Sequence, residues 1–131
     1  MAVEQKAPNR YHHGDLRRAL LAAVDEIVQE LGVEGLSLRE CARRAGVSHG
    51  APAHHFGDKR GMLTEYATDG FEKLLGSISV EFDKLDPADT KGKLKAVGKG
   101  YVAFALAHRA QFKVMFRSEL LDNENERLME R

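Results

Sequence analysis

The sequence predicts an all-α protein: a three-helix bundle with a helix-turn-helix, followed by a long linking helix and a further, incomplete helical domain. Apolar residues recur at helical spacing through most of the chain. Gly32 and Gly46 each follow such a stretch, at the place where a left-handed residue commonly ends a helix. Hydrophobic residues form 43% of the 131 residues, which is typical of a folded globular protein and not of a disordered one.

The chain begins with a polar segment, residues 1–11, that lacks helical periodicity and contains Pro8. We expect a flexible arm there, carrying Lys6 and Arg10; an ordinary disordered terminus is the commoner interpretation of such a segment than an arm that touches DNA. The first helix is predicted to follow and to end at Gly32. Its core-facing positions, at helical spacing, are Leu16, Leu20, Ala23, Val24, Ile27 and Leu31.

The helix-turn-helix is predicted within residues 37–56. Ser37 and Glu40 have the spacing of a capping box, in which a hydroxyl and a carboxylate each bind a free backbone N–H at the start of a helix. The apolar face of this helix comprises Leu38, Cys41, Ala42 and Ala45, and its other side carries Arg39, Arg43 and Arg44. Gly46 then opens a tight turn, and Val47 is expected to fill the crevice between the two helices.

The second helix of the motif is expected to begin after Ser48, whose hydroxyl is predicted to be its N-cap. Pro52 is compatible with a helix that starts here, because the N–H groups of a first turn have no acceptor within the helix. Helix-turn-helix proteins place the early residues of this helix against base edges in the major groove. Residues 49–51 are therefore predicted to face DNA.

A long helix is predicted to begin at Asp58 and to link the motif to the rest of the chain. Its apolar stripe is formed by Met62, Leu63, Tyr66, Phe71, Leu74, Leu75, Ile78, Phe82 and Leu85. Asp86 and Pro87 mark a boundary, since proline cannot continue a helix. A further helix is expected over residues 91–108, followed by a dense apolar cluster in residues 109–117 and a polar tail from Ser118.

The pattern resembles the N-terminal domain of TetR-family transcriptional repressors. The residues that carry the resemblance are Ser37-Leu38-Arg39-Glu40, Ala42, Ala45-Gly46-Val47-Ser48, Gly50, His55-Phe56, Lys59 and Met62-Leu63. Residues 11–17 are similar to the entry to the first helix in one branch of the family. Residues 101–108 and 112–116 are similar, less strongly, to the ligand-binding domain of that branch.

The resemblance implies a DNA-binding domain in residues 12–74 and a partial effector-binding and dimerisation domain in residues 75–131. It implies a ligand-responsive regulator, expected to be a repressor, that binds palindromic operator DNA as a homodimer and releases it when a small-molecule effector binds. The residues expected to contact DNA are Ser37, Arg39, Arg43, Arg44, Ser48, His49, Gly50, Ala51, His54, His55 and Lys59. The candidate lining of an effector pocket is Phe71, Tyr101, Phe104, Phe112, Met115 and Phe116, although aromatic residues at helical spacing more often form simple core.

Two departures from the family pattern support an alternative function. Ala53 stands where members usually carry Tyr or another large aromatic residue that contacts a phosphate, and Ala51 offers no hydrogen-bonding group to a base. The sequence also contains nothing that corresponds to the later helices of the family, so we expect the chain to be a fragment. The alternative is a truncated, DNA-incompetent protein that acts by pairing with a full-length partner.

Composition limits the remaining classes of function. Lys and Arg number 20, as do Asp and Glu, so any attraction to DNA must come from a local patch; residues 39–60 hold such a patch, with five Lys or Arg against two acids. Cys41 is the single cysteine and excludes an intrachain disulfide. The chain shows neither a membrane-spanning apolar run nor a signal peptide, and we expect a cytoplasmic protein.

No catalytic or cofactor-binding pattern emerges from the sequence. Gly98 and Gly100 lack the spacing of a phosphate-binding loop. His54 and His55 are neighbours on a helix and point in different directions, so they are not expected to hold a metal, and the pair of residues 12 and 13 is no better placed. We therefore expect no enzymatic activity, no metal and no cofactor.

Overall fold

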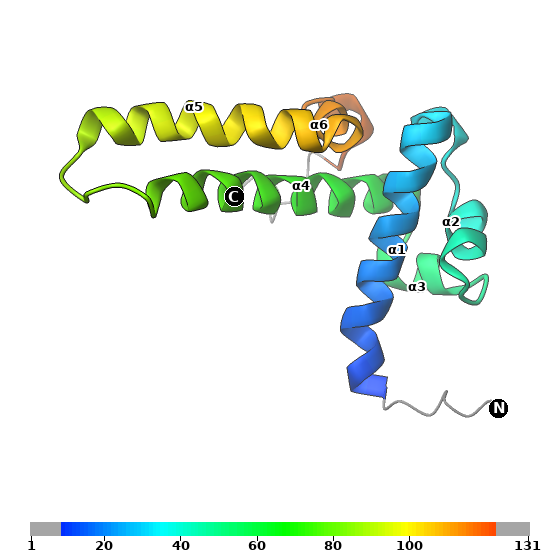
Figure 1. Ribbon diagram of the computed structural model, residues 1–131. Helices are drawn as coiled ribbons and strands as arrows, with labels where there is room; N and C mark the ends of the chain where they lie inside the picture. Colours follow the sequence, from blue (N-terminus) through cyan, green and yellow to red (C-terminus); the bar gives the residue numbers. More distant parts are fainter. Residues whose placement is uncertain (1–8, 123–131) are drawn as a thin grey trace. The chain divides into compact units, whose positions relative to one another are not determined.

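The computed structural model describes residues 9–122, with side chains from residue 14 onward (Figure 1). All regular structure in this range is helical, as the sequence predicted. The elements are α1 (Asn9–Leu31), η2 (Val33–Gly35), α2 (Leu38–Ala45), α3 (Ala51–Phe56), α4 (Lys59–Phe82), α5 (Thr90–Ala107), α6 (Arg109–Met115) and η3 (Ser118–Leu120). None of the helices within these residues is both long and apolar enough to cross a membrane.

The chain divides into two compact units, with the boundary between Met62 and Leu63. This boundary lies inside α4, and the part of α4 after Met62 packs against α5 and α6. The division into a DNA-binding domain over residues 12–74 and an effector-binding domain over residues 75–131 stays a prediction. Helix α1 begins at Asn9, so the end of the expected arm is helical. The rest of the arm, with Lys6, lies outside the described residues, as does most of the polar tail.

The first unit has an apolar core built from α1, α2 and the start of α4. Its fully buried side chains include Leu20, Val24, Ile27, Cys41 and Met62. The Cys41 Sγ donates to the Leu20 carbonyl oxygen at 3.6 Å, which places the middle of α2 directly against α1. Burial of these side chains supplies the main driving force for packing the two helices together.

Local rules fix both ends of α2. The Ser37 hydroxyl accepts a hydrogen bond from the Glu40 backbone N–H at 3.0 Å, which confirms the predicted N-cap. At the other end Gly46 has φ 72°, a left-handed conformation that favours glycine. The Gly46 and Val47 N–H groups donate to the carbonyls of Arg43 and Ala42, which is the pattern of a Schellman motif.

In the second unit, α5 runs back alongside α4 (Figure 1), and α6 follows it after a break at His108. Gly100 of α5 lies against the α4 backbone at Ile78, and Gly70 of α4 lies against the Met115 side chain of α6. Buried Gln111 joins α6 to α4, because its amide donates to the Tyr66 carbonyl at 2.8 Å. The second unit thus combines close backbone approach, a buried apolar core that includes Phe104 and Met115, and the hydrogen bonds of the Gln111 amide.

Candidate nucleic-acid interface

The start of α3 differs from the sequence prediction. Ser48 was expected to cap the helix with its hydroxyl, but α3 begins at Ala51 and its N-cap is Gly50, with no side-chain cap. The Ser48 carbonyl accepts from the Ala51 N–H at 3.1 Å and forms a turn over residues 48–51. This turn moves the helix start along the chain, so the prediction of a Ser48 hydroxyl cap was wrong.

The exposed face of the turn and of α3 is formed by residues that the sequence assigned to DNA contact. Ser48, His49, Gly50 and His54 are exposed, whereas Ala51 and His55 are half-buried. Pro52 and Phe56 point into the core, so α3 is amphipathic although it is short. The buried side of α3 thus anchors the helix in the core, and its exposed side is accessible to a partner.

Four further residues complete the description of this surface. Ala53 is exposed, so the position where the family usually carries an aromatic ring is open to solvent and lacks that ring. The half-buried His55 ring packs edge-on against Phe56, with ring centroids 5.0 Å apart. Lys59 is half-buried at the beginning of α4, and Ser37 is exposed at the beginning of α2.

The three arginines of α2 have different surroundings. Arg39 is exposed. Arg43 is also accessible, with 67% of its side chain exposed, although its Nε and Nη2 donate to the two Glu40 oxygens at 3.0 and 2.6 Å. Arg44 is only 14% exposed and faces α1. Neighbouring positions on a helix differ by about 100° in direction, which explains why consecutive arginines separate in this way.

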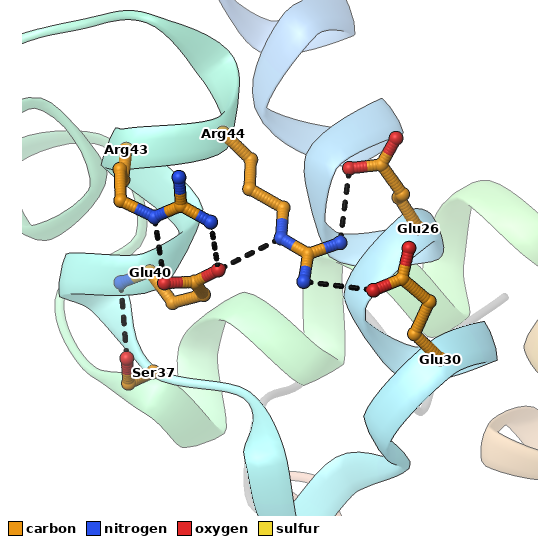
Figure 2. A network of polar contacts seen from close by, with 6 residues as sticks. All are labelled: Glu26, Glu30, Ser37, Glu40, Arg43 and Arg44. Carbon is orange, nitrogen blue, oxygen red and sulfur yellow. Dashed lines mark hydrogen bonds and ion pairs between the residues drawn. The ribbon is translucent and has the colours of Figure 1, made fainter.

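The Arg44 guanidinium lies among three carboxylates (Figure 2). Its Nη1 and Nη2 reach Glu26 and Glu30 of α1 at 3.1 and 2.9 Å, and its Nε reaches Glu40 of α2 at 2.8 Å. Hydrogen bonds from Arg43 and then from Arg44 lower the pKa of Glu40 to about 2. The three carboxylates raise the pKa of Arg44 above its usual range. This group of Glu26, Glu30, Glu40, Arg43 and Arg44 is called the Arg44 network below.

The sequence reasoning missed the acidic half of the network. Glu26 and Glu30 lie four residues apart on α1 and therefore on one face, which was a visible signal. Nothing in the local pattern said that this face would meet Arg44, because that contact depends on how α1 and α2 pack.

The candidate pocket residues form an aromatic cluster in the second unit. Phe112 lies 5.5 Å from Tyr101 and 5.2 Å from Phe116 between ring centroids, and Phe71 lies 5.6 Å from Phe116. Phe104 and Met115 are almost fully buried and belong to the core. Lining of an effector pocket remains a prediction for all six residues, Phe71, Tyr101, Phe104, Phe112, Met115 and Phe116.

Within the part of the chain that the structure describes, no group of three or more His, Cys, Asp or Glu side chains is arranged to hold a metal ion. His49, His54 and His55 lie in one unit but do not converge on a common point of that kind.

Comparison with known proteins places these features in a family. Residues 20–66 match the model of the bacterial regulatory proteins of the tetR family. The chain is 31% identical over 97 residues to the HTH-type transcriptional regulator BetI of Cronobacter sakazakii, an alignment that covers 74% of this chain and 48% of the relative. It is 32% identical over 84 residues to BetI of Escherichia coli, with 64% of this chain and 43% of the relative covered. The chain thus spans about half the length of the curated relatives that it matches.

Two solved structures share the fold of this chain. A protein of unknown function from Rhodococcus sp. RHA1 superposes with a TM-score of 0.75 at 36% identity, over 94% of this chain and 63% of that one. The TetR-family transcriptional regulator PfmR from Thermus thermophilus superposes with a TM-score of 0.68 at 23% identity, over 85% of this chain and 60% of that one, and supports the fold alone. The family match covers α2, the turn and α3 together with the core that supports them, and the chain belongs to the TetR family of bacterial transcriptional regulators.

Proposed function

We propose that this chain recognises double-stranded operator DNA through α2 and α3, acts as a repressor in the cytoplasm, and responds to a small-molecule effector. The observation that carries the proposal is the exposure of His49, Gly50 and His54 on a helix-turn-helix whose opposite side is anchored in a core. In this motif the second helix enters the major groove with its early residues toward the bases. His49 and His54 supply the hydrogen-bonding groups there, since Ala51 and Ala53 have none.

Phosphate contacts in the proposal come from exposed cations beside this surface. Arg39 and Arg43 are accessible on α2, and the ion pair of Arg43 with Glu40 is a surface pair of a kind that exchanges partners at little cost. Such contacts fix the register of the protein on DNA, while base contacts supply the specificity. Arg44 is left out of this set, because three carboxylates already bind its guanidinium.

The proposed protein is a homodimer on a palindromic site. Two recognition helices reach successive major grooves when their half-sites lie about 34–36 Å apart. An effector that changes this separation by a few ångströms would weaken simultaneous contact. We propose the two exposed rings of the aromatic cluster, Tyr101 and Phe116, as the region that meets an apolar effector.

The test is a fluorescence-anisotropy titration with duplex DNA from upstream of the native gene and with a scrambled duplex, at two salt concentrations, with the protein mass measured by light scattering. We expect a dimer that prefers the upstream DNA and loses affinity as salt rises. Equal and weak affinity for both duplexes would refute the proposal.

Gly50→Glu gives a sharp variant for this titration. Gly50 has right-handed backbone angles and no atom within 4 Å of an added Cβ, so glutamate fits the fold and places a carboxylate on the proposed DNA surface. Gly76→Glu is the matched control, since Gly76 is exposed on α4 with the same open surroundings. We expect the first change to abolish preference for the operator and the second to leave it.

A second candidate function rests on Ala53. Because this exposed position lacks the aromatic ring usual in the family, the chain could instead act by pairing with a full-length relative. That function predicts weak DNA binding by this chain alone and a stable mixed dimer with the relative. The named relatives are transcriptional regulators, and the proposal assigns no enzymatic reaction and no cofactor to this chain.

A further inference from the structure

Arg44 ties together the two helices that support the proposed DNA surface. Its guanidinium binds Glu26 and Glu30 on α1 and Glu40 on α2, and the Arg44 side chain is 14% exposed (Figure 2). We propose that Arg44 is a positioning residue for operator recognition, which sets the orientation of α2 and the following turn without touching a phosphate. The inference rests on the DNA-binding function proposed above and deepens it.

The surroundings of Arg44 argue against a direct phosphate contact. Each of Nε, Nη1 and Nη2 already has a carboxylate partner at 3.1 Å or less. To reach DNA, the guanidinium would have to leave Glu26 and Glu30, two like charges one turn apart on α1 that would then repel one another. Arg43 is different, because it is 67% exposed and has one partner, Glu40, which remains paired with Arg44 if Arg43 turns to a phosphate.

Positioning by Arg44 adds what the apolar contact between the helices lacks. The buried side of α2 is formed by the small side chains of Cys41 and Ala42, and the hydrophobic attraction that they contribute is non-directional. A planar guanidinium binds carboxylates only in defined directions. The two contacts with Glu26 and Glu30 therefore restrict the rotation and the slide of α2 on α1, and Glu40 of α2 itself holds the guanidinium in the orientation that makes them. Because α2 continues directly through Gly46 into the turn before α3, a rotated or shifted α2 displaces the residues proposed to contact bases.

Arg44 also offsets charge near the surface that should meet DNA. Without it, the network would hold the three carboxylates of Glu26, Glu30 and Glu40 against the single charge of Arg43, and the local potential would become less favourable for phosphates. A lysine would keep the charge but could not reproduce the three-way fork. Lysine and glutamine at this position therefore separate the geometric contribution of Arg44 from its electrostatic one.

The test compares Arg44→Gln, Arg44→Lys and the matched Arg43→Gln in the full chain. For each, the affinity for the upstream and scrambled duplexes is measured over a series of salt concentrations. A lost phosphate contact weakens binding about equally for all sequences and lowers the slope of log affinity against log salt by about one. We expect this result for Arg43→Gln. For both Arg44 variants we expect the preference for the upstream duplex to fall roughly tenfold, with a slope close to that of the wild type.

A slope lowered by about one in Arg44→Gln would overturn the inference in favour of direct contact. An unchanged preference for the upstream duplex in Arg44→Gln would overturn the inference in favour of a role in stability alone. A wild-type preference in Arg44→Lys would also overturn it, because the charge of residue 44 and not its geometry would then matter. Circular dichroism verifies folding at the assay temperature. If Arg44→Gln does not fold, Glu30→Gln loosens the network with Arg44 still in place, and an unchanged preference there refutes the inference. A wild-type chain without preference would instead refute the proposed function.

Discussion

The close packing of α4 and α5 can be tested with two glycines of the same helix. A Cβ added at Gly100 would lie 2.6 Å from the Ile78 Cα and 2.8 Å from its backbone nitrogen, and backbone cannot move away cheaply. Gly98 is exposed on α5 and has no atom within 4 Å of such a Cβ. Both changes to alanine gain about 0.5–1 kcal/mol of helix propensity. The Gly100 variant alone adds an overpacking cost of about 1–3 kcal/mol.

We therefore expect Gly98→Ala to raise the free energy of unfolding above that of the wild type. The free energy of unfolding of Gly100→Ala should be about 1–3 kcal/mol lower than that of Gly98→Ala. Urea denaturation followed by far-ultraviolet circular dichroism measures both. The comparison cancels the propensity gain, since the two positions share one helix and one substitution. Equal stabilities of the two variants would refute the close approach of α5 to α4 at Ile78.

Burial and charge give further predictions. Cys41 is fully buried, and burial raises its thiol pKa to about 11. Iodoacetamide at pH 8 should therefore label Cys41 slowly in the native protein and rapidly in urea. Rapid labelling of the native protein would contradict the packing of α2 on α1. Gln111→Glu should lower the free energy of unfolding by about 3–5 kcal/mol at neutral pH, because its buried carboxylate would face Asp69. Gln111→Met should lower it by a smaller amount, about 1–3 kcal/mol. Thermal melts measure both variants. The pKa of Glu40 is lowered to about 2, so its stabilising effect is present above about pH 4.5 and is lost as the pH falls toward 2. Acid titrations of stability should be flatter over this window in Glu40→Gln, and identical curves would argue against the Arg44 network.

The helix ends could be predicted well where they depend on residues close in sequence. The Ser37 cap needs only the hydroxyl and the N–H of Glu40, and the end of α2 needs only the left-handed freedom of Gly46. Gly32 ends α1 for the same reason, with φ 73°. Each of these features is decided within one turn of helix, so the local sequence contains the necessary information.

The start of α3 and the role of Arg44 could not be predicted in this way. Ser48 has the residue type of an N-cap, but the backbone from Ser48 to Ala51 forms a turn of its own before the helix begins. Arg44 has the residue type of a phosphate contact, but its neighbours Glu26 and Glu30 are fourteen or more positions earlier in the chain and meet it only through packing. Residue type limits what a side chain can do, and the tertiary contacts decide which of these possibilities is used.

The same packing changes the electrostatic character of the proposed interface. Counted along residues 39–60, five Lys or Arg oppose two acids and suggest a basic patch. The fold brings Glu26 and Glu30 against this patch and binds them to Arg44, so the local excess of positive charge is smaller than the sequence suggests. Attraction to any DNA should then be weak, and useful affinity would have to come from correctly placed base contacts. In such a protein, a residue that only holds the recognition helix in place affects specificity without touching DNA. This is why Arg44, and not one of the exposed cations such as Arg39 or Arg43, is the informative position to change.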